Sequence, residues 1–98
     1  MKAVIFIGAL GISAAAAFGQ GPFERYQKDL EANPRLSLAH FRLGEIFNQQ
    51  GNYQSAANEF RAALAGDLQP RWIEGWAHIN LGRIFDNTGQ RERAANEF

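Results

Sequence analysis

The sequence predicts an all-α protein, a stack of antiparallel helix–turn–helix hairpins forming an α-solenoid of about two and a half repeats. Three observations lead to this expectation. Blocks of sequence recur at a constant interval of 38 residues, apolar residues within each block follow a helical period, and glycines separate the helical segments. With 98 residues, the chain has room for one small domain.

The composition argues against several classes of function. Lys plus Arg number 10 and Asp plus Glu number 10, so the net charge of zero gives no long-range attraction to nucleic acid or to an anionic membrane. The chain has no cysteine, which excludes disulfides, thiol nucleophiles and thiolate metal sites. The fold therefore depends on packing, for which eight Phe, two Trp and two Tyr are available.

The first 19 residues have the features of a secretory signal peptide. Lys2 is followed by a short apolar run, by small residues, and by an Ala-x-Gly arrangement that ends at Gly19. An uncleaved membrane anchor is the alternative, but residues 3–17 are fewer than the roughly 20 that a hydrocarbon core requires. We expect cleavage near Gly19 or Gln20 and no membrane span in the mature chain. The protein is then exported, periplasmic or secreted, as in a bacterial envelope.

Two segments establish the repeat. Leu-Gly-Glu-Ile-Phe at 43–47 recurs as Leu-Gly-Arg-Ile-Phe at 81–85, and Ala-Ala-Asn-Glu-Phe at 56–60 recurs unchanged at 94–98. This register divides the predicted helical domain, residues 20–98, into a partial unit over 23–34, a full unit over 35–70 and an incomplete unit over 71–98. The helices are expected, in order, at 23–31, 36–50, 53–65, 71–87 and 90–98.

The helical segments are read from their apolar faces. In the first, Phe23, Tyr26 and Leu30 form one stripe. In the second, the face that begins at His40 continues at the positions three, four and seven residues later, which are Leu43, Gly44 and Phe47. The third and the last continue the pattern with alanines and a phenylalanine.

The segments between the helices contain residues that start and stop helices. Asn33-Pro34 is expected to cap the second helix. Gly51 can adopt the left-handed conformation that ends this helix, and Asn52 can cap the third. Gly66 is expected to end the third helix, and Pro70 suits the first turn of the fourth.

These residues resemble the tetratricopeptide repeat (TPR). That family has a Leu-Gly pair and an aromatic residue on its first helix, a turn glycine, and alanines with an aromatic residue on its second helix. The matching residues are Leu43, Gly44, Phe47, Gly51, Ala56, Phe60, Leu81, Gly82, Phe85, Gly89, Ala94 and Phe98. The small residues let the two helices approach closely, and the aromatic residues fill the space beside them.

The sequence departs from the family pattern in three respects. The family period is about 34 residues, so we expect four extra residues, between Gly66 and Arg71. His40 and His78 stand where the family often has a large aromatic residue. The second unit stops before its second helix reaches the length of the first unit's.

The resemblance implies that the first helices of the units line a concave face on which an extended peptide lies. The residues beside the Leu-Gly-Phe stripe, with Glu45 among them, are expected to face the partner. Those predicted to bind it are Leu38, Phe41, Arg42, Trp76, Ile79, Asn80 and Arg83. The apolar members suit an extended chain, and the arginines and Asn80 suit its carboxylate and amide groups.

The two tryptophans also have a structural interpretation. Trp72 is expected to pack the four-residue insertion against the neighbouring hairpin in preference to contacting a ligand. For Trp76, packing and ligand binding stay equally open.

His40 and His78 allow a metal pair or hydrogen bonds between helices. Zinc takes three or four ligands, and no further ligand is expected beside the histidines on the same face, so hydrogen bonding is favoured. The sequence shows no Ser/His/Asp set and no glycine-rich phosphate loop. We expect no catalytic residue, no metal and no cofactor, and hence no enzyme.

The function expected from these features is that of an exported protein–protein interaction module or scaffold that binds a peptide or protein partner. The alternative is a structural fragment, the truncated end of a longer TPR array with no ligand of its own, and a regulatory subunit of an enzyme is a third possibility. The incomplete unit further predicts that residues 90–98 fray or mediate self-association. Hydrogen exchange at several protein concentrations would distinguish these two outcomes.

Overall fold

The computed structural model describes residues 21–98, with the side chains of residues 91 and 92 excepted. The signal peptide predicted for residues 1–19 lies outside the described residues. The described part of the chain is all-helical, without a β-strand, as the sequence predicts. Its helices are α2 (Pro22–Ala32), α3 (Ser37–Gln49), α4 (Tyr53–Leu64), α5 (Trp72–Asn87) and α6 (Arg91–Glu97). Each begins and ends within two residues of its predicted bounds.

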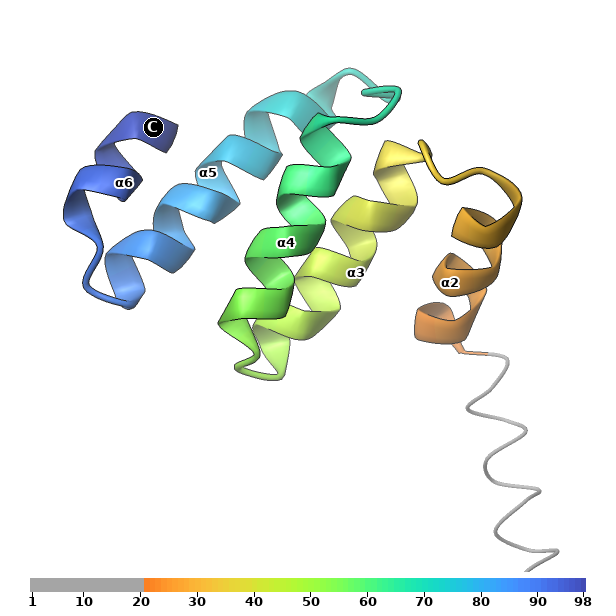
Figure 1. The fold of residues 1–98 in the computed structure, drawn as a ribbon, viewed down its shortest axis with the longest axis horizontal. Helices are drawn as coiled ribbons and strands as arrows, with labels where there is room; N and C mark the ends of the chain where they lie inside the picture. Colours follow the sequence, from red (N-terminus) through yellow and green to blue (C-terminus); the bar gives the residue numbers. More distant parts are fainter. Residues whose placement is uncertain (1–20) are drawn as a thin grey trace, which may run out of the picture.

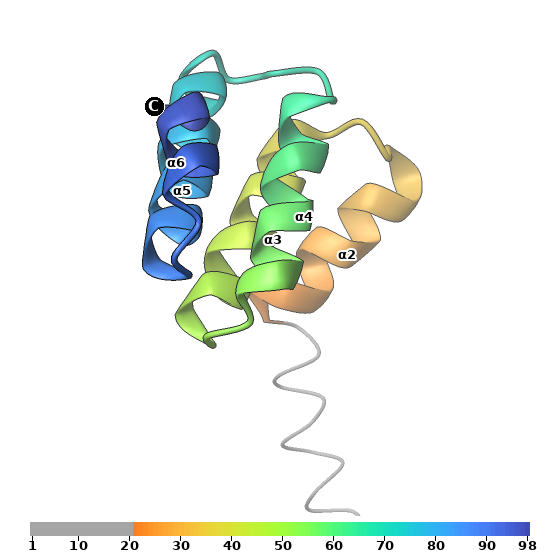
Figure 2. The same ribbon diagram turned by 60° about the vertical axis from the view of Figure 1, so that its left-hand side comes forward.

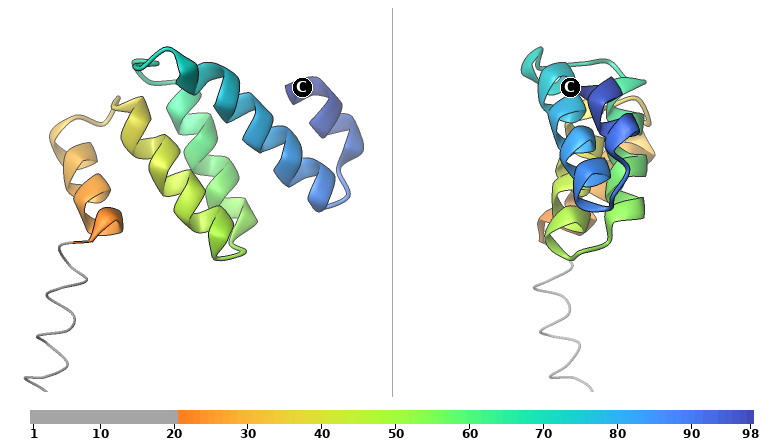
Figure 3. Two further views of the ribbon diagram at one scale, coloured as in Figure 1. Left: turned by 180° about the vertical axis from the view of Figure 1, so that it is seen from behind. Right: turned by 90° about the vertical axis from the view of Figure 1, so that its left-hand side faces the viewer.

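The helices form a row in which each packs against the next, and α3 also contacts α5. Figure 1 shows that successive helices run in opposite directions, so α3 and α5 descend while α2, α4 and α6 ascend. In the turned view, α5 and α6 lie together at one end of the row and α2 lies at the other (Figure 2). Seen along the row, the helices lie over one another (Figure 3). Two packed hairpins, α3–α4 and α5–α6, follow the single helix α2.

The turn inside each hairpin has the same hydrogen-bonded structure. Gly51 and Gly89 have φ angles of 78° and 83°, the left-handed region that glycine enters without steric cost. The next residue donates its N–H to a carbonyl five positions back, with distances of 2.9 Å from Asn52 to Phe47 and 2.6 Å from Gln90 to Phe85. These bonds form the Schellman motif, which satisfies the last carbonyls of a helix. The predicted role of the turn glycine is confirmed in both units.

Two predicted caps and one predicted helix start differ from the structure. Asn52 occupies the N-cap position of α4, but its side chain makes no capping hydrogen bond. The side chain of Asn33 accepts from the N–H of Arg35 at 3.1 Å. This bond stabilises the turn, and α3 begins three residues later than Pro34, at Ser37. Pro70 precedes α5 by two residues and so lies outside its first turn.

Close packing inside each hairpin depends on a glycine that faces a phenylalanine ring. A Cβ atom at Gly44 would lie 2.7 Å from Cε1 of Phe60, which is fully buried. The same contact joins Gly82 to the ring of Phe98 in the second unit. The predicted close approach is therefore present in both hairpins.

The core continues through the row between the hairpins. Phe41 and Phe60 meet with ring centroids 5.4 Å apart, and Ile73 and Ala77 of α5 are fully buried beside them. Fully burying a side chain of this size contributes about 1.5–3 kcal/mol, so this junction is a main source of stability. At the start of the row, α2 packs the ring of Phe23 edge-on against Phe47, with centroids 5.6 Å apart.

A polar cluster, here called the Ser37–Asp67 clasp, joins the start of α3 to the end of α4 and to the loop after it. The Ser37 hydroxyl is buried, donates to the carbonyl of Ala63 at 2.6 Å and accepts from the N–H of Leu68 at 2.9 Å. The Asp67 carboxylate accepts from the N–H groups of Ser37 at 3.2 Å and Gln69 at 3.1 Å. The loop that contains the four extra residues is therefore held by hydrogen bonds at its first half.

The contribution of the clasp to the stability of the protein is expected to be lost in acid, when Asp67 becomes protonated. The pKa of Asp67 is lowered from 3.8, first because the N–H of Gln69 donates to the carboxylate and next because that of Ser37 does. A lowered folded-state pKa stabilises the protein above 3.8, and this contribution is lost as the pH falls through the folded value. The Tm difference between the parent and Asp67→Asn should be largest at neutral pH and shrink in acid. A difference that stays constant into acid would contradict the role of this carboxylate.

Candidate peptide-binding groove

A groove of about 430 Å³ lies between α3 and α5. Both helices run in the same direction (Figure 1). We call it the α3–α5 groove. Its lining residues are Phe41, Arg42 and Glu45 from α3, and Trp72, Trp76, Asn80 and Arg83 from α5.

The α5 side of the groove is one face of a helix. Its lining residues follow one another at intervals of four, four and three residues, which places their side chains in one row. Two of them are the tryptophans, with exposed fractions of 41% at Trp72 and 47% at Trp76. Exposed large aromatic side chains in a groove are typical of interfaces, where they bury much area at little entropic cost.

Each tryptophan carries an arginine guanidinium over its ring. The Cζ atom of Arg42 lies 5.4 Å from the ring of Trp72, and that of Arg83 lies 5.9 Å from the ring of Trp76. Cation–π contacts of this kind contribute about 0.5–1 kcal/mol at exposed sites. They orient the arginines along the groove while their N–H groups remain able to donate.

Trp72 combines the two roles that the sequence left as alternatives. Its ring packs edge-on against Phe41, with centroids 5.3 Å apart and an interplanar angle of 82°. It therefore does contact the neighbouring hairpin, as predicted, but it also lines the groove. The inserted loop is held by the Ser37–Asp67 clasp.

Five of the seven predicted binding residues line the groove, namely Phe41, Arg42, Trp76, Asn80 and Arg83. Phe41 was expected on an open apolar strip, but it is only 2% exposed because Trp72 covers it. Leu38 is half-buried against the core, and Ile79 is half-buried outside the groove. The predicted apolar strip is thus reduced to the two tryptophans, above a floor formed by Phe41.

The charges in the groove are two arginines and one glutamate. Glu45 accepts from Nη1 of Arg42 at 2.8 Å, and both side chains are 38% exposed. Exposed ion pairs three or four residues apart on a helix contribute only about 0.3–0.5 kcal/mol, so a ligand can replace this one at little cost. Among the described side chains, none forms an ion pair with Arg83. The groove therefore offers Arg83 and the Asn80 amide to acceptor groups of a ligand.

The two histidines form matching contacts between the helices of each hairpin. Nδ1 of His40 lies 2.8 Å from Oε1 of Glu59, and Nδ1 of His78 lies 2.8 Å from Oε1 of Glu97. The prediction of hydrogen bonds between helices is confirmed. The glutamates were not foreseen as partners, although both belong to the repeated Ala-Ala-Asn-Glu-Phe segment. Among the side chains that the structure describes, no group of three potential metal ligands comes together.

The two units differ most at the outer face of the second hairpin. Phe98 is 68% exposed, whereas its counterpart Phe60 is fully buried under α5. Ile79 is half-buried where its counterpart Phe41 is buried. The exposed Phe98 ring favours self-association through this face, which stays a prediction.

Comparisons with protein-family models, with curated proteins and with solved structures find no match to this chain. Over the described range, no helix combines the length and the apolar character that crossing a bilayer takes.

Proposed function

We propose that the chain is an exported protein-interaction module of the tetratricopeptide type that binds an extended peptide segment of a partner protein in the α3–α5 groove. One observation carries the proposal. Trp72 and Trp76, the two tryptophans of the chain, both line this groove and both remain about half exposed. Leaving two large aromatic rings in water has a cost that binding a partner would recover.

The tetratricopeptide assignment is supported by the packing of the repeated residues. The turn glycines end their helices with Schellman motifs, and the packing glycines face phenylalanine rings. The signature leucines and alanines are buried, namely Leu43, Ala56, Leu81 and Ala94. Export to the periplasm or the exterior rests on the signal-like residues 1–19 alone.

The groove is suited to an extended peptide by its shape and its donors. It lies between two helices that run in the same direction and extends over three turns of α5, from Trp72 to Arg83. The exposed indoles offer apolar surface to side chains of the peptide. Asn80 can exchange hydrogen bonds with the peptide backbone, and Arg83 can donate to a carbonyl or a carboxylate. The ion pair between Arg42 and Glu45 can open to supply further groups.

Peptides selected from a random library displayed on phage, with the purified protein as bait, should bind this groove. Because the chain has no tryptophan outside it, binding should change the intrinsic tryptophan fluorescence directly. Trp76→Ala should weaken binding of a selected peptide at least tenfold, since aromatic side chains at the centre of an interface often contribute 2 kcal/mol or more. Arg83→Ala should weaken it as well.

The matched control is Tyr53→Ala, which removes an aromatic ring of similar exposure, 40%, away from the groove. It should leave the affinity unchanged, and circular dichroism should show that all three variants keep their helicity. Unchanged affinity in both groove variants would place the binding site elsewhere and disprove the proposal.

A further inference from the structure

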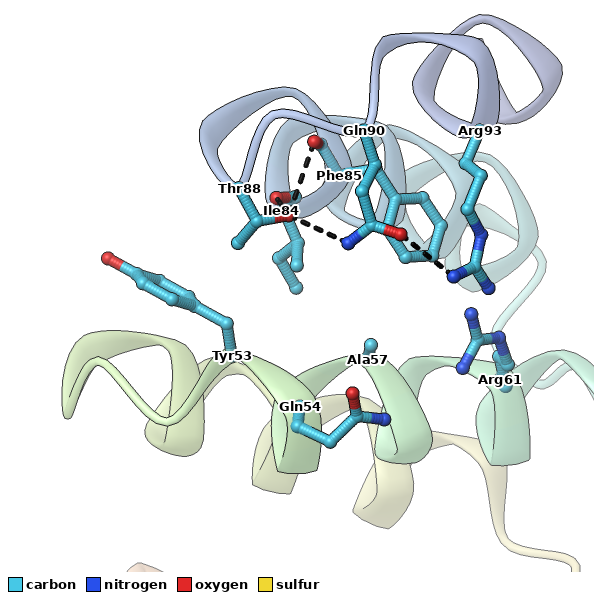
Figure 4. Close-up of a pocket in the computed structure, with 9 residues that line it drawn as sticks. All are labelled: Tyr53, Gln54, Ala57, Arg61, Ile84, Phe85, Thr88, Gln90 and Arg93. Carbon is cyan, nitrogen blue, oxygen red and sulfur yellow. Dashed lines mark hydrogen bonds between the residues drawn. The ribbon is translucent and has the colours of Figure 1, made fainter.

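A second, smaller pocket of about 90 Å³ lies between α4 and the turn that joins α5 to α6. It shares no residue with the α3–α5 groove. Figure 4 shows its lining, with Tyr53 at one side and two arginines, Arg61 and Arg93, at the other. The remaining lining residues are Gln54, Ala57, Ile84, Phe85, Thr88 and Gln90.

The two arginines converge on the same aromatic ring from different hairpins. The Cζ atoms of Arg61 and Arg93 lie 5.3 Å and 4.5 Å from the ring centroid of Phe85. Their guanidinium groups point toward each other across the edge of the pocket (Figure 4). The buried Phe85 ring thus positions two positive charges side by side.

Hydrogen bonds hold one of these charges in place. Nη1 of Arg93 donates to Oε1 of Gln90 at 2.9 Å, and Nε2 of Gln90 donates to the Thr88 hydroxyl at 3.0 Å. That hydroxyl donates to the carbonyl of Ile84, 2.9 Å away. A side chain held through such a series loses little further entropy when it binds a ligand.

The positive charge of the two arginines is not neutralised by an acidic group among the described side chains. None of the described carboxylates forms an ion pair with Arg61 or Arg93. The ring of Phe85 attracts both cations but cannot neutralise them. Each guanidinium presents five N–H donors, and most of those at the pocket have no acceptor in the described part of the chain.

We infer that this pocket binds a small oxyanion, of the carboxylate or phosphate class, between the guanidinium groups of Arg61 and Arg93. Guanidinium groups bind both anions through paired, charge-assisted hydrogen bonds. The bound anion joins α4 of the first hairpin to α6 of the second, so it should also stabilise the junction between them. The anion is either free in solution or an acidic side chain of a protein, and the two sources share this chemistry.

Isothermal titration calorimetry of the purified protein tests the inference at constant ionic strength. The probes are inorganic phosphate and the blocked tripeptide acetyl-Glu-Glu-Glu-amide. Chloride is the reference anion without oxygen acceptors, and acetyl-Gln-Gln-Gln-amide is the uncharged reference peptide. At least one of the two anionic probes should bind. Arg61→Gln and Arg93→Gln should each weaken that binding about tenfold or more, because each removes a hydrogen bond between charged groups. The bound probe should raise the Tm of the parent protein.

Arg25→Gln is the matched control, since it removes the same charge on α2, far along the row. It should bind the probes like the parent. Binding of phosphate alone identifies a free ion as the ligand, and binding of the glutamate peptide alone identifies a protein carboxylate. Failure of both probes to bind, or equal binding by both pocket variants and the parent, would overturn the inference. The affinity for a peptide in the α3–α5 groove should be the same in the parent and in these three variants. The experiment therefore tests the anion pocket separately from the proposed function.

Discussion

Replacing Gly44 with leucine is expected to destabilise the protein by about 1–3 kcal/mol or more, the cost of overpacking a core. The first side-chain atom alone would lie 2.7–2.9 Å from three atoms of the Phe60 ring. Phe60 is fully buried and packs against Phe41, so its ring has no free space to move into. The helices α3 and α4 would have to separate. For a domain of this size, each kcal/mol lowers the Tm by roughly 4–8 °C.

Gly75 provides the matched control because it is a helical glycine in an open position. A Cβ atom there meets nothing within 4 Å, and the residue does not have a positive φ. Gly75→Ala should therefore raise stability by up to about 1 kcal/mol, the difference in helix propensity. Thermal unfolding followed by circular dichroism compares the variants. Equal Tm values for Gly44→Leu and the parent would contradict the packing between α3 and α4.

Removal of the Ser37 hydroxyl is the second change with a large expected effect. Ser37→Ala leaves the carbonyl of Ala63 and the N–H of Leu68 without this partner beside a fully buried position. Leaving buried polar groups unpaired costs about 1–3 kcal/mol. The loop after α4 would also lose the bond from the Leu68 N–H to the start of α3, so hydrogen exchange of the Leu68 amide should become faster.

Ser55→Ala is the control for this prediction. Ser55 is half-buried on α4 and takes part in none of the side-chain hydrogen bonds of the clasp. Its replacement should change the stability by less than about 0.5 kcal/mol. A Tm for Ser37→Ala as high as that of Ser55→Ala would show that the clasp contributes nothing to stability.

The sequence was sufficient to predict the helices because their ends depend on local signals. Glycine can adopt the left-handed conformation that ends a helix, and it occupies the same turn position in both units, as Gly51 and Gly89. The side-chain caps were predicted less well. Asn33 and Asn52 have the right chemistry, but whether an amide bonds to a helix N–H or to the adjacent turn depends on backbone angles that the sequence does not specify.

The sites depend on the register between helices, which the sequence specifies only in part. Arg42 of α3, with Asn80 and Arg83 of α5, was found because the helical period places each beside the Leu-Gly-Phe stripe of its own helix. For Trp72, packing was favoured over ligand contact, because its surroundings depend on the path of the loop after α4. The convergence of Arg61 and Arg93 was not foreseen, since these residues lie outside the repeated blocks and meet only when the two hairpins pack together.

The Ser37–Asp67 clasp has a mechanical consequence. It closes residues 37–68 into a ring, because the hydrogen bonds join Ser37 at the start of α3 to the end of α4 and to the loop after it. The position equivalent to Ser37 in the next unit is Gly75, which has no side chain with which to form a second clasp. When the chain is pulled from its carboxyl end, α6 and α5 should therefore peel away first, at low force. The ring then bears the load across several hydrogen bonds at once, and it should open in a separate step at higher force.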